Sequence, residues 1–276
     1  MEEKLLQMKS LVERLNQASD SYYNGKGELM TDYEWDALFD QLKRLEEETG
    51  EILPDSPTNR VSEDSIVGKK EEHEFAALSL AKTKQVSDLV KWAEDRPIWI
   101  SWKLDGLTLV VTYDGGKLTK IVTRGNGHIG TNITHLAPAI SGIPATISEK
   151  GHLVVRGEAV ISYADFEQFI IESEGDYANP RNLASGSLTL KDIDEVKQRH
   201  IQWIPFTLVY TERELTSWGE RMQMLKDLGM NPVERERIDH PTTENIQLEI
   251  DKFTEKVTSK KNPFPVDGLV ICYDDT

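Results

Sequence analysis

The fold that we expect for this chain is determined by one stretch, Ile98-Trp99-Ile100-Ser101-Trp102-Lys103-Leu104-Asp105-Gly106-Leu107-Thr108-Leu109-Val110-Val111-Thr112-Tyr113. Its first part, Ile98–Trp102, and the β-branched run Leu107–Tyr113 are each typical of a strand. Asp114-Gly115-Gly116 then indicates a hairpin turn, and Leu118–Thr123 supplies a third strand. The stretch therefore predicts a sheet of sequential strands, with a short polar segment between the first two.

That polar segment, Lys103-Leu104-Asp105-Gly106, permits two interpretations. Alternation along an extended chain places Lys103 and Asp105 on the same face. A lysine beside a carboxylate, ahead of a glycine that lets the backbone approach a ligand, suits a covalent amine nucleophile. The same residues also fit a solvated strand that ends in an Asp-Gly bend, because short motifs often match by chance. The rest of the chain has to decide between the two.

Composition limits the class of protein. The chain has 276 residues, of which 38% are hydrophobic, enough for one large domain or two unequal ones. No run of about 18 apolar residues occurs, and the N-terminus is charged and amphipathic, so we expect neither a membrane span nor a secretion signal. The single cysteine, Cys272, excludes an intramolecular disulfide and a multi-cysteine zinc site, and it fits a cytoplasmic protein.

The charge balance limits the partners. Lys and Arg number 32 against 48 Asp and Glu, a formal net charge of −16. Such a surface repels a phosphate backbone unless its cations gather on one face, and no long Lys/Arg run is present. If the substrate is a nucleic acid, we expect other domains or another chain to supply most of the binding.

The N-terminal part is predicted to be a small helical unit followed by a connector. One amphipathic helix runs to about residue 23, and a second begins after Thr31 and ends at Gly50. Residues 51–80 form the connector, and we place the domain boundary near residue 68. The unit carries an aromatic and acidic cluster that is either core and helix caps or a socket for a flat heterocycle and its ribose. The members of this cluster that matter below are Tyr22, Tyr23, Asp32, Trp35 and Asp36.

Strands and helices are interspersed in the remainder without strict βαβ alternation, which predicts an α+β fold with an antiparallel-rich sheet. Asn179 is expected to cap a helix that has Pro180 in its first turn. Arg124, beside three glycines, could bind a phosphate or sugar. Glu158 lies in a strand so apolar that it needs a partner or a ligand, and a structural and a functional role remain equally open. The other expected elements are helices at about 86–95, 162–173, 221–228 and 245–259, a short helix after residue 131, and strands at 152–161, 201–210 and 266–273.

Five ordered motifs together resemble the bacterial NAD-dependent DNA ligases. They are Lys103-Leu104-Asp105-Gly106, Thr123-Arg124-Gly125-x-Gly127, Val155-Arg156-Gly157-Glu158, Ala178-Asn179-Pro180-Arg181-Asn182 with Gly186-Ser187-Leu188, and Asp267-Gly268-Leu269-Val270-Ile271. Each motif alone is weak, but the ordered set covers nearly the whole chain. The resemblance implies a nucleotidyltransferase (ATP-grasp-like DNA ligase adenylation) domain at residues 69–276, preceded by a helical NMN-binding subdomain at residues 1–68. The OB-fold, zinc, helix-hairpin-helix and BRCT parts of the family are absent from this sequence.

The resemblance also implies roles for individual residues. The lysine at position 103 attacks the adenylyl phosphate of NAD, releases NMN and holds AMP as a phosphoramidate used to seal nicks in duplex DNA. A free lysine has a pKa near 10.4, so its deprotonation at neutral pH costs roughly 4 kcal/mol, and Mg²⁺ or a basic side chain nearby would help. Asp105 orients the amine or the metal. The implied NAD-binding residues are Glu158, Arg124 and Arg181 at the ribose and phosphate, Phe206 over the adenine, Ser79 and Leu80 in the nucleotide pocket, and Tyr22, Tyr23, Asp32, Trp35 and Asp36 at NMN.

Several positions depart from the family pattern. Ser101 stands where the family has a glutamate that contacts the adenine, and Cys272 replaces the lysine that closes the last motif, so a cation near the phosphate is missing. Asn126 and Thr189 replace an aspartate and an arginine. Two alternatives therefore stay open: a divergent module that binds NAD or NMN with weak or no catalysis, and an acidic interaction subunit of a split ligase. For the isolated chain we expect a cytoplasmic monomer that needs the missing domains or a second subunit to act on nicked DNA.

Overall fold

The structure is a computed structural model that describes residues 2–23, 29–30, 32–51, 53, 56–58, 68–77, 80–125, 127–173 and 177–275. The chain divides into two compact units, Met1–Ser65 and Ile66–Thr276, which are described separately. Among the described residues, no helix is both long enough and apolar enough to cross a bilayer.

The first unit is a pair of antiparallel helices, α1 (Glu2–Tyr23) and α2 (Asp32–Thr49). Lys4 near the start of α1 pairs with Glu48 near the end of α2 at 3.0 Å, which fixes the antiparallel direction. The facing stripes of the two helices bury a small apolar core, formed by Met8, Leu11, Val12, Leu15, Leu42 and Leu45. The expected helix pair is therefore confirmed, and amphipathic spacing accounts for it.

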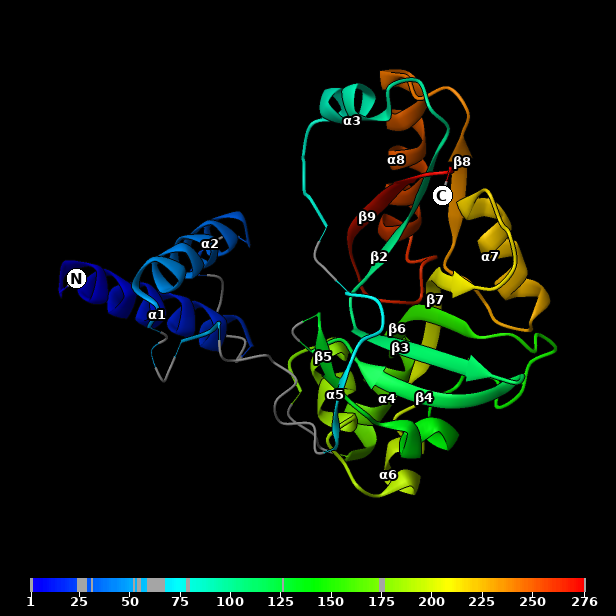
Figure 1. Cartoon of the computed structure of the whole chain (residues 1–276), viewed down its shortest axis with the longest axis horizontal. Helices are drawn as coiled ribbons and strands as arrows, with labels where there is room; N and C mark the ends of the chain where they lie inside the picture. The colour runs from blue at the N-terminus through cyan, green and yellow to red at the C-terminus, as the bar shows by residue number, and fades with distance from the viewer. Residues whose placement is uncertain are drawn as a thin grey trace. The chain divides into compact units, whose positions relative to one another are not determined.

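The second unit contains a four-stranded antiparallel sheet in the order β4-β3-β6-β7 (Figure 1). Gly115 and Gly116 join two of its strands with positive φ angles of 60° and 77°, as a two-residue hairpin turn requires. One face packs the main core, and the opposite face carries Thr108, Arg156 and Glu158; we call this opposite face the Glu158 face. Its strands are β3 (Leu107–Asp114), β4 (Lys117–Thr123), β6 (Leu153–Val160) and β7 (Gln202–Thr211).

A three-stranded antiparallel sheet in the order β8-β2-β9 lies beside the first. Side chains alternate along β2 (Ile98–Leu104), so Ile100 and Trp102 point to one face, against α8 (Thr243–Thr258). There the ring of Phe253 meets Trp102 edge-on at 4.6 Å between centroids. The opposite face carries Trp99, Ser101 and Lys103, and we call it the Lys103 face. The outer strands of this sheet are β8 (Arg235–Ile238) and β9 (Val266–Tyr273).

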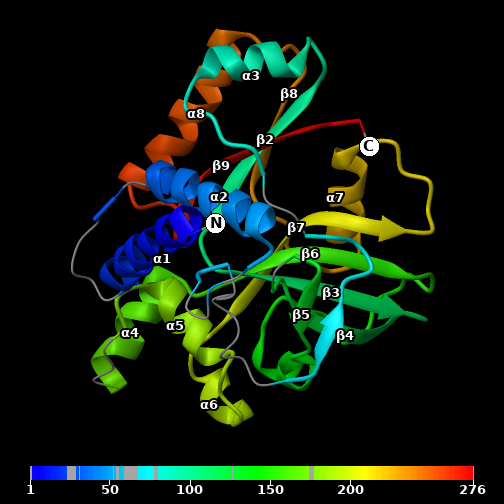
Figure 2. The ribbon, with the colours of Figure 1, turned by 60° about the vertical axis from the view of Figure 1, so that its left-hand side comes forward.

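The helix α7 (Trp218–Asp227) connects the two sheets. Its Trp218 ring lies 5.5 Å from Trp99 of β2, and its Arg221 donates to the carbonyl of Leu208 in β7 at 3.1 Å. Figure 2 shows α7 beside β7, and α3 next to α8. The remaining elements are β1 (Lys70–Glu72), α3 (Val86–Ala93), β5 (Ile129–Thr131), the 3₁₀ helix Thr134–Ala139, α4 (Tyr163–Ser173), α5 (Pro180–Ser187) and α6 (Ile193–Lys197).

The antiparallel-rich α+β architecture agrees with the sequence, and the differences have local causes. The helix expected from residue 221 begins earlier, because Ser217 and Glu220 form a reciprocal capping box. The helix expected to reach residue 95 ends at Ala93, because Glu94 and Asp95 adopt left-handed backbone angles. β1, β5, β8 and α6 were not predicted, since elements of three to five residues carry too few apolar positions to show a period.

Candidate functional site

Lys103 lies near the end of β2, and its amine is held by a carboxylate from the neighbouring strand. Lys103 Nζ pairs with Asp267 of β9, and both side chains are about half-exposed. Opposite Lys103 the register between the strands slips, so that Asp267 and Gly268 together occupy one pairing position. Gly268 has a φ of 127°, which L side chains rarely adopt. This bulge turns the Asp267 carboxylate toward the amine, as bulges next to functional sites commonly do.

Asp105 belongs to a second ion pair next to Lys103. β2 ends at Leu104, so the expected alternation does not extend to Asp105, whose backbone N–H donates to the Pro265 carbonyl at 2.9 Å. Its carboxylate accepts from Arg181 Nη1 at 3.0 Å. Arg181 lies in the first turn of α5, where Asn179 caps the helix and Pro180 follows, as the sequence predicted. The helix capped by Asn179 thus holds an arginine beside the Lys103 segment.

The chain passes close to β6 at Gly106. A Cβ atom on Gly106 would lie 2.1 Å from the Ala159 carbonyl oxygen, so no larger residue fits without a backbone shift. The approach lets the Gly106 N–H donate to Glu158 Oε1 at 3.2 Å. The hydroxyl of Thr108 donates to Glu158 Oε2 at 2.9 Å. The glycine therefore has a specific use, which is to bring the Lys103 segment against the buried glutamate.

Glu158 is 9% exposed, and burial raises the pKa of its carboxyl from 4.5 to about 7. The hydrogen bond from Thr108 and the positive charges of Arg181 and Lys103 act in the opposite direction and only partly offset burial. These electrostatic interactions show that Lys103, Arg181 and Glu158 form one group, although they come from β2, α5 and β6. The sequence predicted that Glu158 needs a partner in its apolar strand, and the structure gives its carboxyl several.

Two arginines on the four-stranded sheet hold the segment that precedes residue 78. Arg124 Nε donates to the Ala77 carbonyl at 2.9 Å. Arg156 Nη2 donates to the carbonyls of Phe75 and Ala76 at 2.9 and 2.8 Å. Burial, and then the charge of Arg124, lower the pKa of Arg156. Arg124, the arginine expected at a phosphate or sugar, therefore contacts the backbone of this segment in the structure.

Two of the positions that depart from the family pattern, Ser101 and Cys272, lie on the Lys103 face, whereas Thr189 follows α5 and Asn126 lies outside the described residues. Ser101 is buried and pairs with Val270, while Cys272 pairs with Trp99 farther along β9. Burial, and then the negative charge of Asp274, raise the pKa of the Cys272 thiol to about 12. A neutral thiol supplies no positive charge, so position 272 contributes none to this group.

Phe206 lies in β7, in the neighbouring sheet, and is partly buried. The strand pairing places Ile204 opposite Glu158, so alternation brings Phe206, two residues on, to the Glu158 face. A register slip between Arg156 and Gly157 leaves Phe206 outside the regular pairing. Such a bulge bends the strand locally and re-aims the side chain.

Six of the predicted site residues lie outside what the structure describes. Ser79 is one. The side chains of Tyr22 and Tyr23 at the end of α1, and of Asp32, Trp35 and Asp36 in the first turns of α2, are the others, although their backbones are helical. Leu80 is described and is 65% exposed. The predicted NMN socket therefore remains a prediction.

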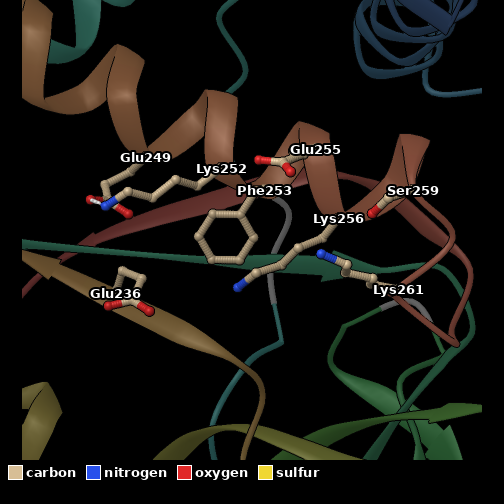
Figure 3. A pocket seen from close by; sticks show the side chains of 8 residues that line it. All are labelled: Glu236, Glu249, Lys252, Phe253, Glu255, Lys256, Ser259 and Lys261. Atoms are coloured by element: carbon tan, nitrogen blue, oxygen red, sulfur yellow. Dashed lines mark hydrogen bonds and ion pairs between the residues drawn. The ribbon is translucent and has the colours of Figure 1, made fainter.

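A hollow beside α8 is not part of this group (Figure 3). Its floor is Phe253, which packs on Trp102 and thus on the face of β2 opposite to Lys103. Its volume of about 190 Å³ is smaller than the about 300–1,000 Å³ of typical ligand pockets. Two of its three lysines already form ion pairs, Lys252 with Glu249 and Lys256 with Glu234. We therefore read it as a solvated groove.

Sequence reasoning gave no role to two residues of the group, Asp267 and Thr108. Asp267 was recognised only as part of a motif, although an Asp-Gly pair inside a strand is itself a sign of a bulge. Thr108 resembled any β-branched strand residue. Within the described residues, no three His, Cys, Asp or Glu side chains gather as a metal site.

The comparisons with known proteins cover the whole chain. Residues 69–276 match the family described as NAD-dependent DNA ligase adenylation domain, and residues 1–62 match the DNA ligase-like, N-terminal NAD⁺-binding domain. A DNA ligase of Lachnoclostridium phytofermentans is 39% identical over 100% of this chain, as is one of Ruminiclostridium cellulolyticum. In both cases the chain spans only 42% of the relative's length.

Proposed function

The chain belongs to the NAD-dependent DNA ligase family, and on that premise we propose that it carries out the self-adenylation step at Lys103. The lysine amine attacks the adenylyl phosphorus of NAD, forming an N–P bond. The P–O bond to NMN breaks, and NMN departs with the bonding electron pair. The single observation that supports this proposal most strongly is the pairing of the Lys103 amine with Asp267 in a group that also contains Glu158 and Arg181.

The neighbouring side chains accept the lysine protons and bind the phosphate and ribose of the substrate. The lysine ammonium must lose one proton before attack and a second as the N–P bond is completed, and Asp267 is the carboxylate in contact with it. Arg181, whose position the ion pair with Asp105 fixes, donates to the phosphate. Glu158, held by Thr108 and the Gly106 N–H, accepts a hydrogen bond from a ribose hydroxyl in this proposal. These roles use pre-organised groups, which is how most phosphoryl transfer is catalysed.

Mg²⁺ fits this site as an ion carried mainly by the substrate. The described residues offer no three-ligand cage, and Mg²⁺ commonly uses one or two carboxylates together with substrate phosphates and water. Asp105 is the carboxylate that we expect to take part. When bound, the ion supplies positive charge against the dinucleotide phosphates.

The rest of the cycle extends beyond this chain. We propose residues 1–68 as the NMN-binding subdomain and residues 69–276 as the adenylation domain, acting in the cytoplasm. Because the chain spans less than half of its relatives, nick sealing in duplex DNA during replication or repair is proposed only for the chain together with further domains or a second subunit. The net charge of −16 supports that division, since it disfavours DNA binding by the chain alone.

Intact-mass measurement after incubation with NAD and Mg²⁺ tests the proposal, with ATP in a parallel sample. We expect a gain of one AMP with NAD and none with ATP. Lys103→Arg is the matched control, because it keeps the positive charge but cannot supply a neutral amine. Absence of an AMP adduct on the wild-type protein would contradict the proposal.

One observation favours a second candidate, a module that binds NAD with little chemistry. Position 272 carries a half-buried neutral thiol where the family resemblance places a lysine, so one cation is lost from the site. Calorimetry that shows NAD binding without NMN release would select this candidate over self-adenylation.

A further inference from the structure

His152 contacts two carboxylates at one end of the four-stranded sheet. The antiparallel register of β3 and β6 brings Asp114 and His152 together, one position beyond the last pair of these strands. His152 Nδ1 lies 2.6 Å from Asp114 Oδ1, and its Nε2 lies 2.9 Å from Glu74 Oε2. Asp114 belongs to the sheet, whereas Glu74 belongs to residues 73–77, which we call the 73–77 segment. The imidazole therefore joins this segment to the sheet.

Both contacts of the imidazole can be hydrogen bonds only when the ring is protonated. A neutral imidazole has one N–H donor and one acceptor nitrogen, whereas an imidazolium donates from both nitrogens. An ionised carboxylate only accepts, so loss of the ring proton leaves a nitrogen lone pair facing one of the two carboxylates. In agreement with this geometry, the hydrogen bond to Asp114, and then that to Glu74, raise the pKa of His152, while burial acts in the opposite direction.

The other contacts of the 73–77 segment do not depend on this proton. The ring of Phe75 stacks on that of Tyr210 in β7, with 5.4 Å between the centroids. His73 Nε2 lies 2.9 Å from the Arg124 carbonyl oxygen, and an imidazole can donate such a bond in either protonation state. The arginine contacts with the segment described above also keep their charge. The bridge through His152 is thus the pH-sensitive part of the attachment.

The surroundings of the imidazole supply further charges, but these belong to other kinds of side chain. Glu212 Oε1 accepts from the His152 backbone N–H at 3.1 Å, and Lys120 acts electrostatically on Asp114. Histidine is the side chain whose ordinary pKa lies between about pH 5 and 8. The charged and titratable groups on the neighbouring elements are Lys117, Lys120, Glu149, Tyr210, Glu212 and Arg213.

We propose that His152 is a pH-sensitive clamp that holds the 73–77 segment against the four-stranded sheet when its imidazole is protonated. Because the pKa of His152 is raised in the folded protein, the stabilisation is complete below the ordinary value of about 6.5 and is lost as the pH rises through the raised value. Positions 79 and 80, which the family resemblance places in the nucleotide pocket, follow this segment directly in the sequence. The clamp itself does not depend on the self-adenylation step.

Hydrogen exchange followed by mass spectrometry tests the clamp on the whole chain. The Ala77 N–H donates to the Gly127 carbonyl at 2.7 Å, so its protection from exchange reports whether the 73–77 segment is in place. The measured quantity is the ratio of wild-type to His152→Gln protection, which cancels the intrinsic effect of pH on exchange. We expect a ratio of about three at pH 6, in the range of a partly exposed ion pair, and about one at pH 9.

Two further variants make the result specific. Glu74→Gln removes one carboxylate from an exposed position and should lower the protection of the segment at pH 6 as His152→Gln does. His200→Gln is the matched control, because His200 pairs with Asp165 of α4 at 3.0 Å and does not contact the segment. A ratio for His152→Gln that is the same at pH 6 and pH 9 would overturn the inference. So would an equal change of the ratio in His200→Gln.

Discussion

Replacing Glu158 by Gln should make the protein more stable at neutral and alkaline pH. The substitution keeps the shape of the side chain and both of its contacts, since the amide oxygen can accept from the Gly106 N–H while the amide nitrogen donates to Thr108. It removes a carboxyl that is buried and whose pKa is raised from 4.5 to about 7. The wild-type protein must either bury a charge or retain a proton, and the variant does neither.

The magnitude follows from the linkage between protonation and folding. Because the pKa is higher in the folded state, the folded protein binds more protons than the unfolded chain between about pH 4.5 and pH 7. The contribution of Glu158 to stability is therefore greatest below this window and is lost as the pH rises through it. A rise in pKa from 4.5 to about 7 corresponds to about 3 kcal/mol, and most of this falls between about pH 5 and pH 8.

Urea unfolding followed by tryptophan fluorescence measures the effect at several pH values. The free energy of unfolding of Glu158→Gln, relative to wild type, should rise by roughly 2 kcal/mol or more from about pH 5 to pH 8. Glu167→Gln, an exposed position on α4, is the control and should show no such trend. A difference between Glu158→Gln and wild type that stays constant across this range would refute the argument that burial dominates at Glu158.

Two further predictions concern Gly106 and Cys272, which lie in the same compact unit as Glu158. Gly106→Ala should lower the free energy of unfolding by at least about 2 kcal/mol, because its Cβ would lie 2.1 Å from a backbone oxygen; a urea midpoint equal to that of wild type would contradict the close approach. Cys272, the single cysteine, should react slowly with iodoacetamide at about pH 8 in the native protein and rapidly in urea, because burial raises its thiol pKa to about 12. Equal alkylation rates in the two states, followed by mass spectrometry, would show that the thiol is neither buried nor neutral.

The parts of the fold that the sequence predicted are those with a long hydrophobic period or a specific turn signal. The helix pair, the Gly115-Gly116 hairpin and the Asn179-capped helix that contains Arg181 all belong to this class. Short edge strands such as β8 were missed, because pairing with β2 rather than their own composition stabilises them.

The candidate site divides in the same way. Lys103 and Glu158 could be singled out from sequence because each is a polar residue that interrupts an apolar strand. Asp267 could not be given a role, because its contact with Lys103 depends on a bulge and a positive φ at Gly268. Arg124 was expected at the ligand, and the structure shows its Nε bound to the Ala77 carbonyl. The sequence shows that Arg124 can donate hydrogen bonds, but only the structure shows that a backbone carbonyl accepts one of them.

Peptide mapping of the protein after incubation with NAD and Mg²⁺ tests the central claim most directly. We expect one AMP, released by mild acid as a phosphoramidate should be, on the peptide that contains Lys103, together with one equivalent of free NMN. An AMP found on a different lysine, or NMN release without any protein-bound AMP, would contradict the assignment of the Lys103 amine as the nucleophile.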